Sequence, residues 1–414
     1  MFETAVAYGF KWRYFYNADK TVYFVWGVDE YPHIDVMFCG KRMVRSPKCR
    51  HMGVTLTADK KISEEVWEER IGKGKQAIFA GMGIGGANVT TSPNTMSKLY
   101  WAISIPKMIY GAETTPMTDS CIDMLEDAHR HHANMIQNLP VRTPKPAPLA
   151  VLGWQSISSY IAYLKIMFMV RTLCLPPTSL YRQLMIIGMN VYKRNGERGE
   201  RIVTPVGDIM KYVDRYGLND LIQRCVDDGQ WEMTQSCKVA VKKRVLTYEE
   251  RSWRASCMLY RKLTLYVEII PRRCINLWWT VVSHMSGYFK RISCVIALIC
   301  GTQPNGYGAN FGLNPRCQIC VSYESETFEH TVFCCDALDQ ARRRLMDDLK
   351  EAMPQNMWVD FERMSYSSRL KFLLSGLNCD RYMPEWRDVY LRVSDLIFGL
   401  YRARALSYKE LTVT

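Results

Sequence analysis

The spacing of apolar residues changes once along this chain, near residue 60, and that change limits the folds it can adopt. Before this point the apolar residues gather in short segments of strand length, preceded by a short amphipathic helix over Met1–Tyr8. Cys39, Gly40 and Lys41 supply turn residues between two of these segments. The predicted strands are Thr21–Trp26, Ile34–Phe38 and His51–Leu56. So few short elements enclose too little core, and residues 1–60 are therefore predicted to be the incomplete end of an α+β unit.

From residue 63 onward the apolar residues recur at the helical period, which predicts a mainly α protein. The first helix begins at Ser63, followed by two glutamates that suit the helix dipole, and it ends near the glycines of residues 81–86. Three prolines between residues 144 and 148 mark a connector, and residues 275–300 are predicted to be largely buried. Further helices are predicted over Asn94–Tyr110, Asp119–Asn138, Ser156–Leu175, Ser179–Asn195, Thr204–Tyr216, Glu232–Leu246, Ala337–Met353 and Trp386–Ser407.

The charge balance favours a polyanionic partner. Of the 414 residues, 54 are Lys or Arg and 41 are Asp or Glu, which gives a formal net charge of +13. Nucleic acid is the first candidate for such a partner and an anionic membrane surface the second. No apolar stretch approaches the roughly 20 residues of a membrane-spanning helix, and Met1 is followed by no secretory apolar region. Most of the 15 cysteines are far apart in the sequence, which favours a reducing compartment. The expectation is a soluble, intracellular protein of the cytoplasm or nucleus, without a membrane partner.

The strongest local motif is Cys317-x2-Cys320-x9-His330-x4-Cys335. Two thiolates separated by two residues can hold one ion from a tight turn, and a His and a Cys about one helical turn apart can complete a tetrahedron. Four protein ligands leave no position for a substrate water, so the predicted role of the Zn²⁺ is structural. Cys334 is an alternative fourth ligand, less favoured because it follows an apolar segment that can pack inward. A chance grouping in a cysteine-rich chain is the other interpretation.

Several patterns that resemble catalytic motifs lack the context that their chemistry needs. The glycines of residues 81–86 follow a helix and not a strand, so they do not fit a dinucleotide-binding turn. The acid pairs Asp227-Asp228 and Asp347-Asp348 lie in helical segments, away from any apolar hairpin that a two-metal polymerase requires. His129, His131 and His132 are interpreted as surface or phosphate-facing residues. No catalytic residue is predicted.

Cations alternate with aromatic residues in two places, Lys11–Tyr14 and Arg251–Arg261, and the basic run Lys238–Arg244 lies just before the second. This pattern suits a nucleic acid, since cations pair with phosphates and rings stack on bases. A solvated helix surface is the alternative interpretation. The predicted nucleic-acid contacts from this pattern are Lys11, Trp12, Arg13, Lys238, Lys242, Lys243, Arg244, Arg251 and Arg254, and a further run after the cysteine cluster adds Arg342, Arg343 and Arg344.

Four segments precede the cysteine cluster: Trp12 with Phe15–Thr21, His51–Val54, Pro106–Glu113 (Pro-Lys-Met-Ile-Tyr-Gly-Ala-Glu), and Thr143-Pro144 with Leu149 and Leu152–Trp154. Taken in order, these segments and the cluster resemble the C-terminal part of the reverse transcriptase of non-LTR (LINE-type) retrotransposons. The last of them is the cysteine cluster, which falls where that family carries a C-terminal zinc knuckle, although its nine-residue gap is slightly long. His51 and Met52 depart from the Tyr and Leu that are usual in the family.

The resemblance implies a domain order and three further residues that contact nucleic acid. Lys20 would lie near the incoming nucleotide, and Met52 and Gly53 would lie beside the primer end. The implied domains are a partial palm over residues 1–60, a helical thumb over 61–150, a basic helical linker over 151–315, a zinc knuckle over 316–336 and C-terminal helices over 337–414.

The catalytic aspartates of the family would lie upstream of Met1, so the resemblance implies a polymerase remnant that is inactive as this chain. Mg²⁺ would enter only if another chain completed the palm. The leading hypothesis is therefore a protein that binds RNA or DNA through basic helices and a zinc knuckle. A helical protein–protein scaffold and a truncated part of an active reverse transcriptase are the alternatives.

Overall fold

The structure is a computed structural model, and it describes residues 2–23, 35–57, 60–85, 91–197, 204–302, 316–317, 319–320, 324–325, 327–379 and 381–413. The described residues are mostly helical, which confirms the predicted mainly α class, and the strands lie before residue 60 as expected. None of the described helices is long and apolar enough to cross a membrane.

The described part of residues 2–57 is a small unit with α1 (Phe2–Lys11) and three two-stranded sheets. The predicted turn is confirmed, because Cys39 and Gly40 have φ values of 49° and 73° and join β2 to β3. The predicted single strand His51–Leu56 is wrong: a turn at residues 52–53 divides it into two antiparallel strands. The strands are β1 (Val22–Tyr23), β2 (Met37–Phe38), β3 (Lys41–Arg42), β4 (Val44–Arg45), β5 (Lys48–His51) and β6 (Val54–Thr57).

The other two predicted strands are described only in part. Residues 24–26 of the first and Ile34 of the second lie outside the described residues. The remainder forms β1, which pairs in parallel with β4, and β2, which pairs with β3.

The first group of helices packs around the long helix α2 (Lys60–Gly85). Gly74 makes a close approach possible, because a Cβ there would lie 2.1 Å from Cγ of Met108 on α4. The predicted helix Asn94–Tyr110 widens in the middle to a π-helical turn, η2, just before Pro106, whose ring nitrogen cannot donate a helical hydrogen bond. The other elements of this group are α3 (Pro93–Leu99), η2 (Tyr100–Ser104), α4 (Ile105–Ile109), α5 (Asp119–Gln137) and α6 (Ala147–Val151).

The second group of helices has its own core around α7 (Ile157–Leu173). Nζ of Lys165 lies 2.9 Å from Oδ2 of Asp208 and donates to the carbonyl of Thr115 at 2.6 Å, so a buried ion pair joins two helices of this group. The predicted helix Glu232–Leu246 continues much further, to Met258, because its buried stripe extends through Trp253 and Cys257. The other helices are α8 (Leu180–Glu197), α9 (Pro205–Arg215), α10 (Asn219–Asp228) and α11 (Met233–Met258).

The third group contains the C-terminal helices. Trp278, Trp279 and Val295 are fully buried, which confirms the prediction for residues 275–300. Two nine-residue helices, α16 and α17, were not predicted, because each is too short to show a clear period. The helices are α12 (Thr264–Ile269), α13 (Leu277–His284), α14 (Phe289–Ile299), α15 (Asp339–Ala352), α16 (Gln355–Arg363), α17 (Tyr366–Leu374) and α18 (Arg387–Val413). Single turns are η1 (Ala18–Lys20), η3 (Arg261–Leu263), η4 (Ser286–Tyr288), η5 (His330–Cys334), η6 (Asp336–Leu338) and η7 (Pro384–Trp386).

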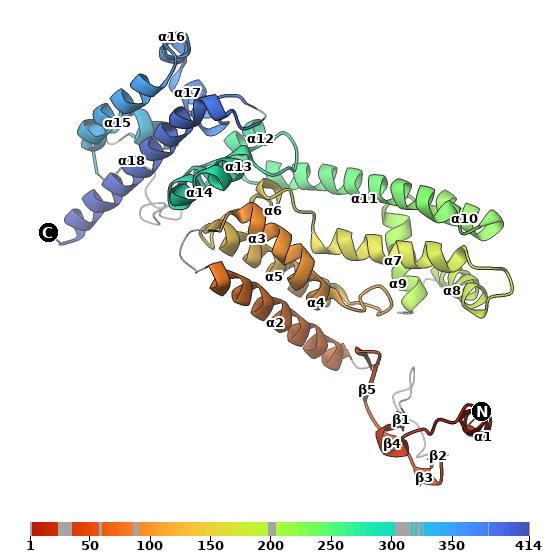
Figure 1. The fold of residues 1–414 in the computed structure, drawn as a ribbon. Helices are drawn as coiled ribbons and strands as arrows, with labels where there is room; N and C mark the ends of the chain where they lie inside the picture. Colours follow the sequence, from red (N-terminus) through yellow and green to blue (C-terminus); the bar gives the residue numbers. More distant parts are fainter. Residues whose placement is uncertain are drawn as a thin grey trace.

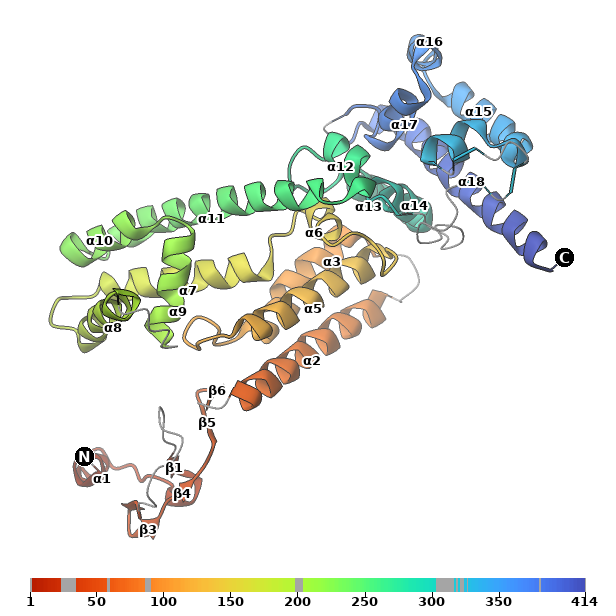
Figure 2. The same ribbon diagram turned by 180° about the vertical axis from the view of Figure 1, so that it is seen from behind.

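The molecule is elongated, and the first helical group contacts the second through α5 and α7 and the third through α3 and α13 (Figure 1). The unit of residues 2–57 lies at one end of α2, and α15–α18 lie at the opposite end of the helical body (Figures 1 and 2). Helix α11 runs beside α7 along the body (Figure 2). Buried side chains of α2–α5 and of α13, α14 and α18 form one continuous core. The helices predicted as the thumb therefore belong to the same core as the C-terminal helices. The domain boundaries themselves stay predictions.

Candidate metal centre and basic surfaces

Cys317, Cys320, His330 and Cys335 come together in one buried cluster. Their donor atoms all lie within 4.8 Å of one another. Sγ of Cys317 is 3.9 Å from Sγ of Cys335, and Sγ of Cys320 is 3.4 Å from Nε2 of His330. Tetrahedral zinc, with Zn–S near 2.3 Å and Zn–N near 2.0 Å, would separate its ligand atoms by about 3.5–3.8 Å. The cluster therefore has the size and the donors of a site that could hold a metal ion.

Local backbone structure brings the four residues together. The amide of Cys317 donates to the carbonyl of Glu324 at 2.8 Å, which fixes the first cysteine beside Glu324. The π-helical turn η5 then joins the other two ligands, and the amide of Cys335 donates to the carbonyl of His330 at 2.7 Å. This wide turn places Cys335 in the cluster and leaves Cys334 outside it, half-buried.

Electrostatics in the cluster favour ligand chemistry. The thiol of Cys335 lies beside Cys317 and lowers the pKa of Cys317 to about 4. The same contact, together with burial, raises the pKa of Cys335. Cys317 is therefore disposed to be a thiolate, the form of cysteine that binds a metal ion. Nδ1 of His330 lies 2.9 Å from Oε2 of Glu324, which leaves Nε2 facing the cysteines.

Arg342 on α15 holds the end of the cluster turn. Its Nε donates to the carbonyl of Val332 at 3.1 Å, and its Nη2 donates to the carbonyl of Cys335. Phe333 of the same turn stacks on Tyr366, with ring centroids 5.4 Å apart. These contacts attach the metal-ligand turn to α15 and α17. Neither Glu324 nor the role of Arg342 in this turn was predicted from the sequence, since both depend on the folded backbone.

Helix α11 carries the largest group of predicted nucleic-acid contacts. Its buried stripe includes Cys237, Val241 and Val245, and that stripe leaves the cations on the outer surface. Among the described residues no carboxylate pairs with these cations, which are Lys238, Lys242, Lys243, Arg244 and Arg251. Arg254 differs, because it pairs with Glu250 at 3.4 Å and donates to the carbonyl of Pro271. In the run on α15, Arg343 is exposed and pairs with Asp339, and Arg344 is exposed.

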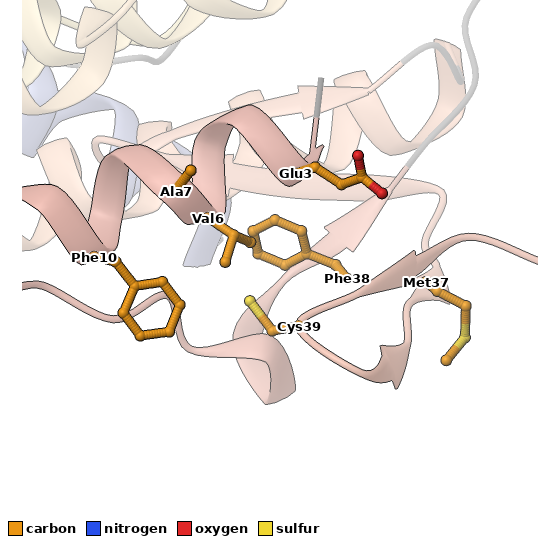
Figure 3. Close-up of a pocket in the computed structure, with 7 residues that line it drawn as sticks. All are labelled: Glu3, Val6, Ala7, Phe10, Met37, Phe38 and Cys39. Atoms are coloured by element: carbon orange, nitrogen blue, oxygen red, sulfur yellow. The ribbon is translucent and has the colours of Figure 1, made fainter.

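The N-terminal predicted contacts lie on the small unit. Lys11 ends α1, Trp12 is 61% exposed, Arg13 has a φ of 57°, and Lys20 ends the exposed turn η1. An open groove of about 360 Å³ lies between α1 and the β2–β3 hairpin, where Val6 and Phe10 face Phe38 and Cys39 (Figure 3). Phe10, the residue before Lys11, therefore lines an open apolar groove rather than a closed site.

The turn of Met52 and Gly53 is fixed to the first helical group. The Tyr110 hydroxyl donates to the carbonyl of Met52 at 2.9 Å, and Arg70 donates to the carbonyl of Gly53 at 3.1 Å. Gly111 has a φ of 79°, and a Cβ there would lie 2.7 Å from Val54. Two segments that carry the family resemblance, residues 51–54 and 106–113, are thus in direct contact.

The acid pairs and the three histidines, none of which was predicted to be catalytic, lie on helices. Asp227 and Asp228 end α10, while Asp347 and Asp348 lie on α15. The prediction that the three histidines face the surface or a phosphate is wrong for two of them. His129 and His132 are buried, and Nδ1 of His129 lies 2.8 Å from the Tyr100 hydroxyl, whereas His131 is exposed.

Comparison of the chain with protein-family models, with curated proteins and with solved structures finds no match.

Proposed function

We propose that this chain binds RNA or DNA through the outer surface of α11 and through a zinc-stabilised C-terminal turn. The exposed cations of α11 carry the proposal, because side chains without a carboxylate partner are free to neutralise phosphates. The net charge of +13 supports the same partner. The run Arg343–Arg344 adds positive charge beside the metal-ligand turn.

Zn²⁺ is the ion that the Cys317, Cys320, His330 and Cys335 donors suit best, since soft thiolates with one imidazole favour it. Its role would be structural, because a four-ligand set leaves no open coordination position. The turn that it would stabilise also contacts Arg342 and Tyr366, so metal binding would fix the turn on the C-terminal helices.

The origin of the chain belongs to the same proposal. A remnant of a non-LTR retrotransposon reverse transcriptase, with the end of a palm, a thumb, a linker and a knuckle, would explain the order of its segments. The contact between Tyr110 and Met52 supports it, because the primer-side hairpin and the thumb would meet there. Within this origin, the role proposed for the described residues is nucleic-acid binding.

Salt dependence of binding tests the proposal. We expect the affinity for an RNA or DNA oligonucleotide to fall steeply with added salt, and to fall further when Lys242, Lys243 and Arg244 are changed together to glutamate. A triple change at Lys193, Arg194 and Lys211, which are exposed on α8 and α9 and have no carboxylate partner among the described residues, is the matched control. Affinity that does not respond to salt, or that responds equally to both triple variants, would contradict the proposal.

A protein–protein scaffold is the second candidate, favoured by the exposed apolar side chains of the small N-terminal unit. Phe10 is 64% exposed and Met37 is 54% exposed beside the groove of Figure 3. If the chain is a scaffold and does not bind nucleic acid, changing Lys242, Lys243 and Arg244 to glutamate will not alter the amount of RNA that it retains. Changing Phe10 and Met37 to serine would then abolish the capture of a protein partner.

A further inference from the structure

An aromatic groove lies between α11 and the surface where η2 and the start of α7 come together. It encloses about 490 Å³, and three rings, those of Trp101, Trp154 and Tyr160, contribute to its walls. The Trp101 ring meets the Tyr160 ring edge-on at 5.3 Å and the Trp154 ring edge-on at 6.1 Å. Flat apolar walls of this kind suit a planar ligand that can stack.

The rings are held in place by the core behind them. Trp154 is 3% exposed, stacks on Tyr100 with centroids 4.5 Å apart, and donates from Nε1 to the Ser97 hydroxyl at 3.1 Å. Gly153 also lines the groove, at a φ of 67°, and a Cβ there would lie 2.9 Å from the amide of Ile275. The groove is therefore preformed, so a ligand does not have to order it.

Helix α11 supplies the opposite wall. Lys242, Leu246 and Glu250 are spaced four residues apart, so they lie on one face of the helix, and all three line the groove. Lys242 is exposed and has no carboxylate partner among the described residues. Its ammonium group is therefore available to an anionic group of the ligand.

The charges in the groove favour an anionic ligand over a cationic one. Glu250, the acid of the groove, is already paired with Arg273 and with Arg254, each at 3.4 Å. Arg273 also pairs with Glu249 at 2.9 Å. A methylated lysine, the other common ligand of aromatic pockets, would find its acid neutralised and Lys242 repelling it.

We propose that this groove binds one unpaired nucleotide of a single strand. Its base stacks on the ring of Trp101 and meets the ring of Tyr160 edge-on, because these two rings stand at 88° to each other, and its phosphate pairs with Lys242. A base within a duplex is already stacked between its neighbours, so only a single-stranded or extruded base can enter. This inference rests on the proposed function and makes it specific, because it gives α11 a site that recognises bases in addition to a surface that attracts phosphates.

The test compares three probes of equal length on the full chain: a single-stranded oligonucleotide, an abasic strand with the same phosphates, and a duplex. Affinity is measured by fluorescence anisotropy. We expect the base-bearing single strand to bind about 5- to 150-fold more tightly than the abasic strand, the range that base stacking supplies. Trp101→Leu and Tyr160→Leu should remove this preference while leaving affinity for the abasic strand unchanged, and circular dichroism checks that both variants are folded.

Lys242→Glu and its neighbour Lys243→Glu form a matched pair, since both residues are exposed on α11 and only Lys242 lines the groove. We expect Lys242→Glu to weaken binding of the base-bearing strand more than Lys243→Glu does. The groove proposal would be overturned if Lys242→Glu and Lys243→Glu weakened binding equally, or if the preference for the base-bearing strand survived both ring substitutions. Salt-sensitive binding in that case would still support the proposed function. Absence of binding to every probe would overturn both. Binding of a trimethyl-lysine peptide that depends on Trp101 would assign the groove to a protein ligand.

Discussion

His330 and Glu324 form a carboxylate–imidazole pair at the metal-ligand cluster, with Nδ1 of the histidine 2.9 Å from Oε2 of the glutamate. Because that nitrogen is engaged, Nε2 is the atom left to coordinate a metal ion, and it faces Sγ of Cys320 at 3.4 Å. Such a partner fixes the tautomer and the ring orientation of a ligand and increases its basicity. The pair therefore makes Glu324 part of the site although it is not a ligand.

The first prediction concerns this pair. Glu324→Gln should keep the four ligands but weaken zinc binding by about 10- to 100-fold, because the amide supports the imidazole less well than a carboxylate does. Competition with a chromophoric chelator measures the change. Glu351→Gln, an exposed acid on α15 away from the cluster, is the control and should bind zinc as the parent does. Equal affinities for both variants would show that Glu324 is incidental.

The second prediction separates the two adjacent cysteines. Cys335→Ser should abolish stoichiometric zinc binding and lower the melting temperature, because it removes a donor of the cluster. Cys334→Ser should retain the metal, since that thiol lies outside the donor set. Elemental analysis of purified variants, with thermal unfolding followed by circular dichroism, gives both readouts. Metal retained in Cys335→Ser and lost in Cys334→Ser would reverse the assignment.

The sequence predicted the elements whose signals are local. The four ligands could be recognised because their spacing is short, and the long helices because their period repeats. The sequence could not decide whether Cys334 or Cys335 is the fourth ligand. The answer depends on a π-helical turn, in which the amide of Cys335 donates to the carbonyl of His330, five residues earlier. Helices α16 and α17 offer too few residues for a period to emerge.

Other features required the folded chain or were overlooked. Arg342 is one of three consecutive arginines, and only the position of the Val332 and Cys335 carbonyls distinguishes its role. The burial of His129 and His132 did have a sequence signal, because residues three apart share a helix face, and His129 follows the buried Leu125 by four. The aromatic groove joins residues 101, 154 and 242, whose proximity no local pattern reveals.

The third prediction tests whether Arg342 acts within the fold. Arg342→Met should destabilise the chain by about 2 kcal/mol, because it removes charged donors from two carbonyls of the metal-ligand turn. Arg343→Met should be nearly neutral in stability, since that side chain is 78% exposed. Urea denaturation of both variants measures the difference. A loss of nucleic-acid binding in Arg342→Met without a loss of stability would assign Arg342 to the binding surface instead.

The last prediction is a pH dependence of stability. Burial lowers the pKa of His129 to about 3 and that of His132 to about 4, from an ordinary value of 6.5. Between these values and 6.5 the unfolded chain binds more protons than the folded chain, so stability falls as the pH falls. From about pH 7.5 to about pH 5 each buried histidine should cost about 2 kcal/mol of unfolding free energy.

Denaturant unfolding over this pH range measures the slope. Replacing His132 with glutamine should flatten it, because glutamine carries no titrating group, whereas the same replacement at the exposed His131 should leave the slope unchanged. An equal slope in the parent and in both variants would show that other groups govern acid unfolding. A slope of opposite sign would mean that the imidazoles are charged in the fold, which their burial against Tyr100 and Trp154 opposes.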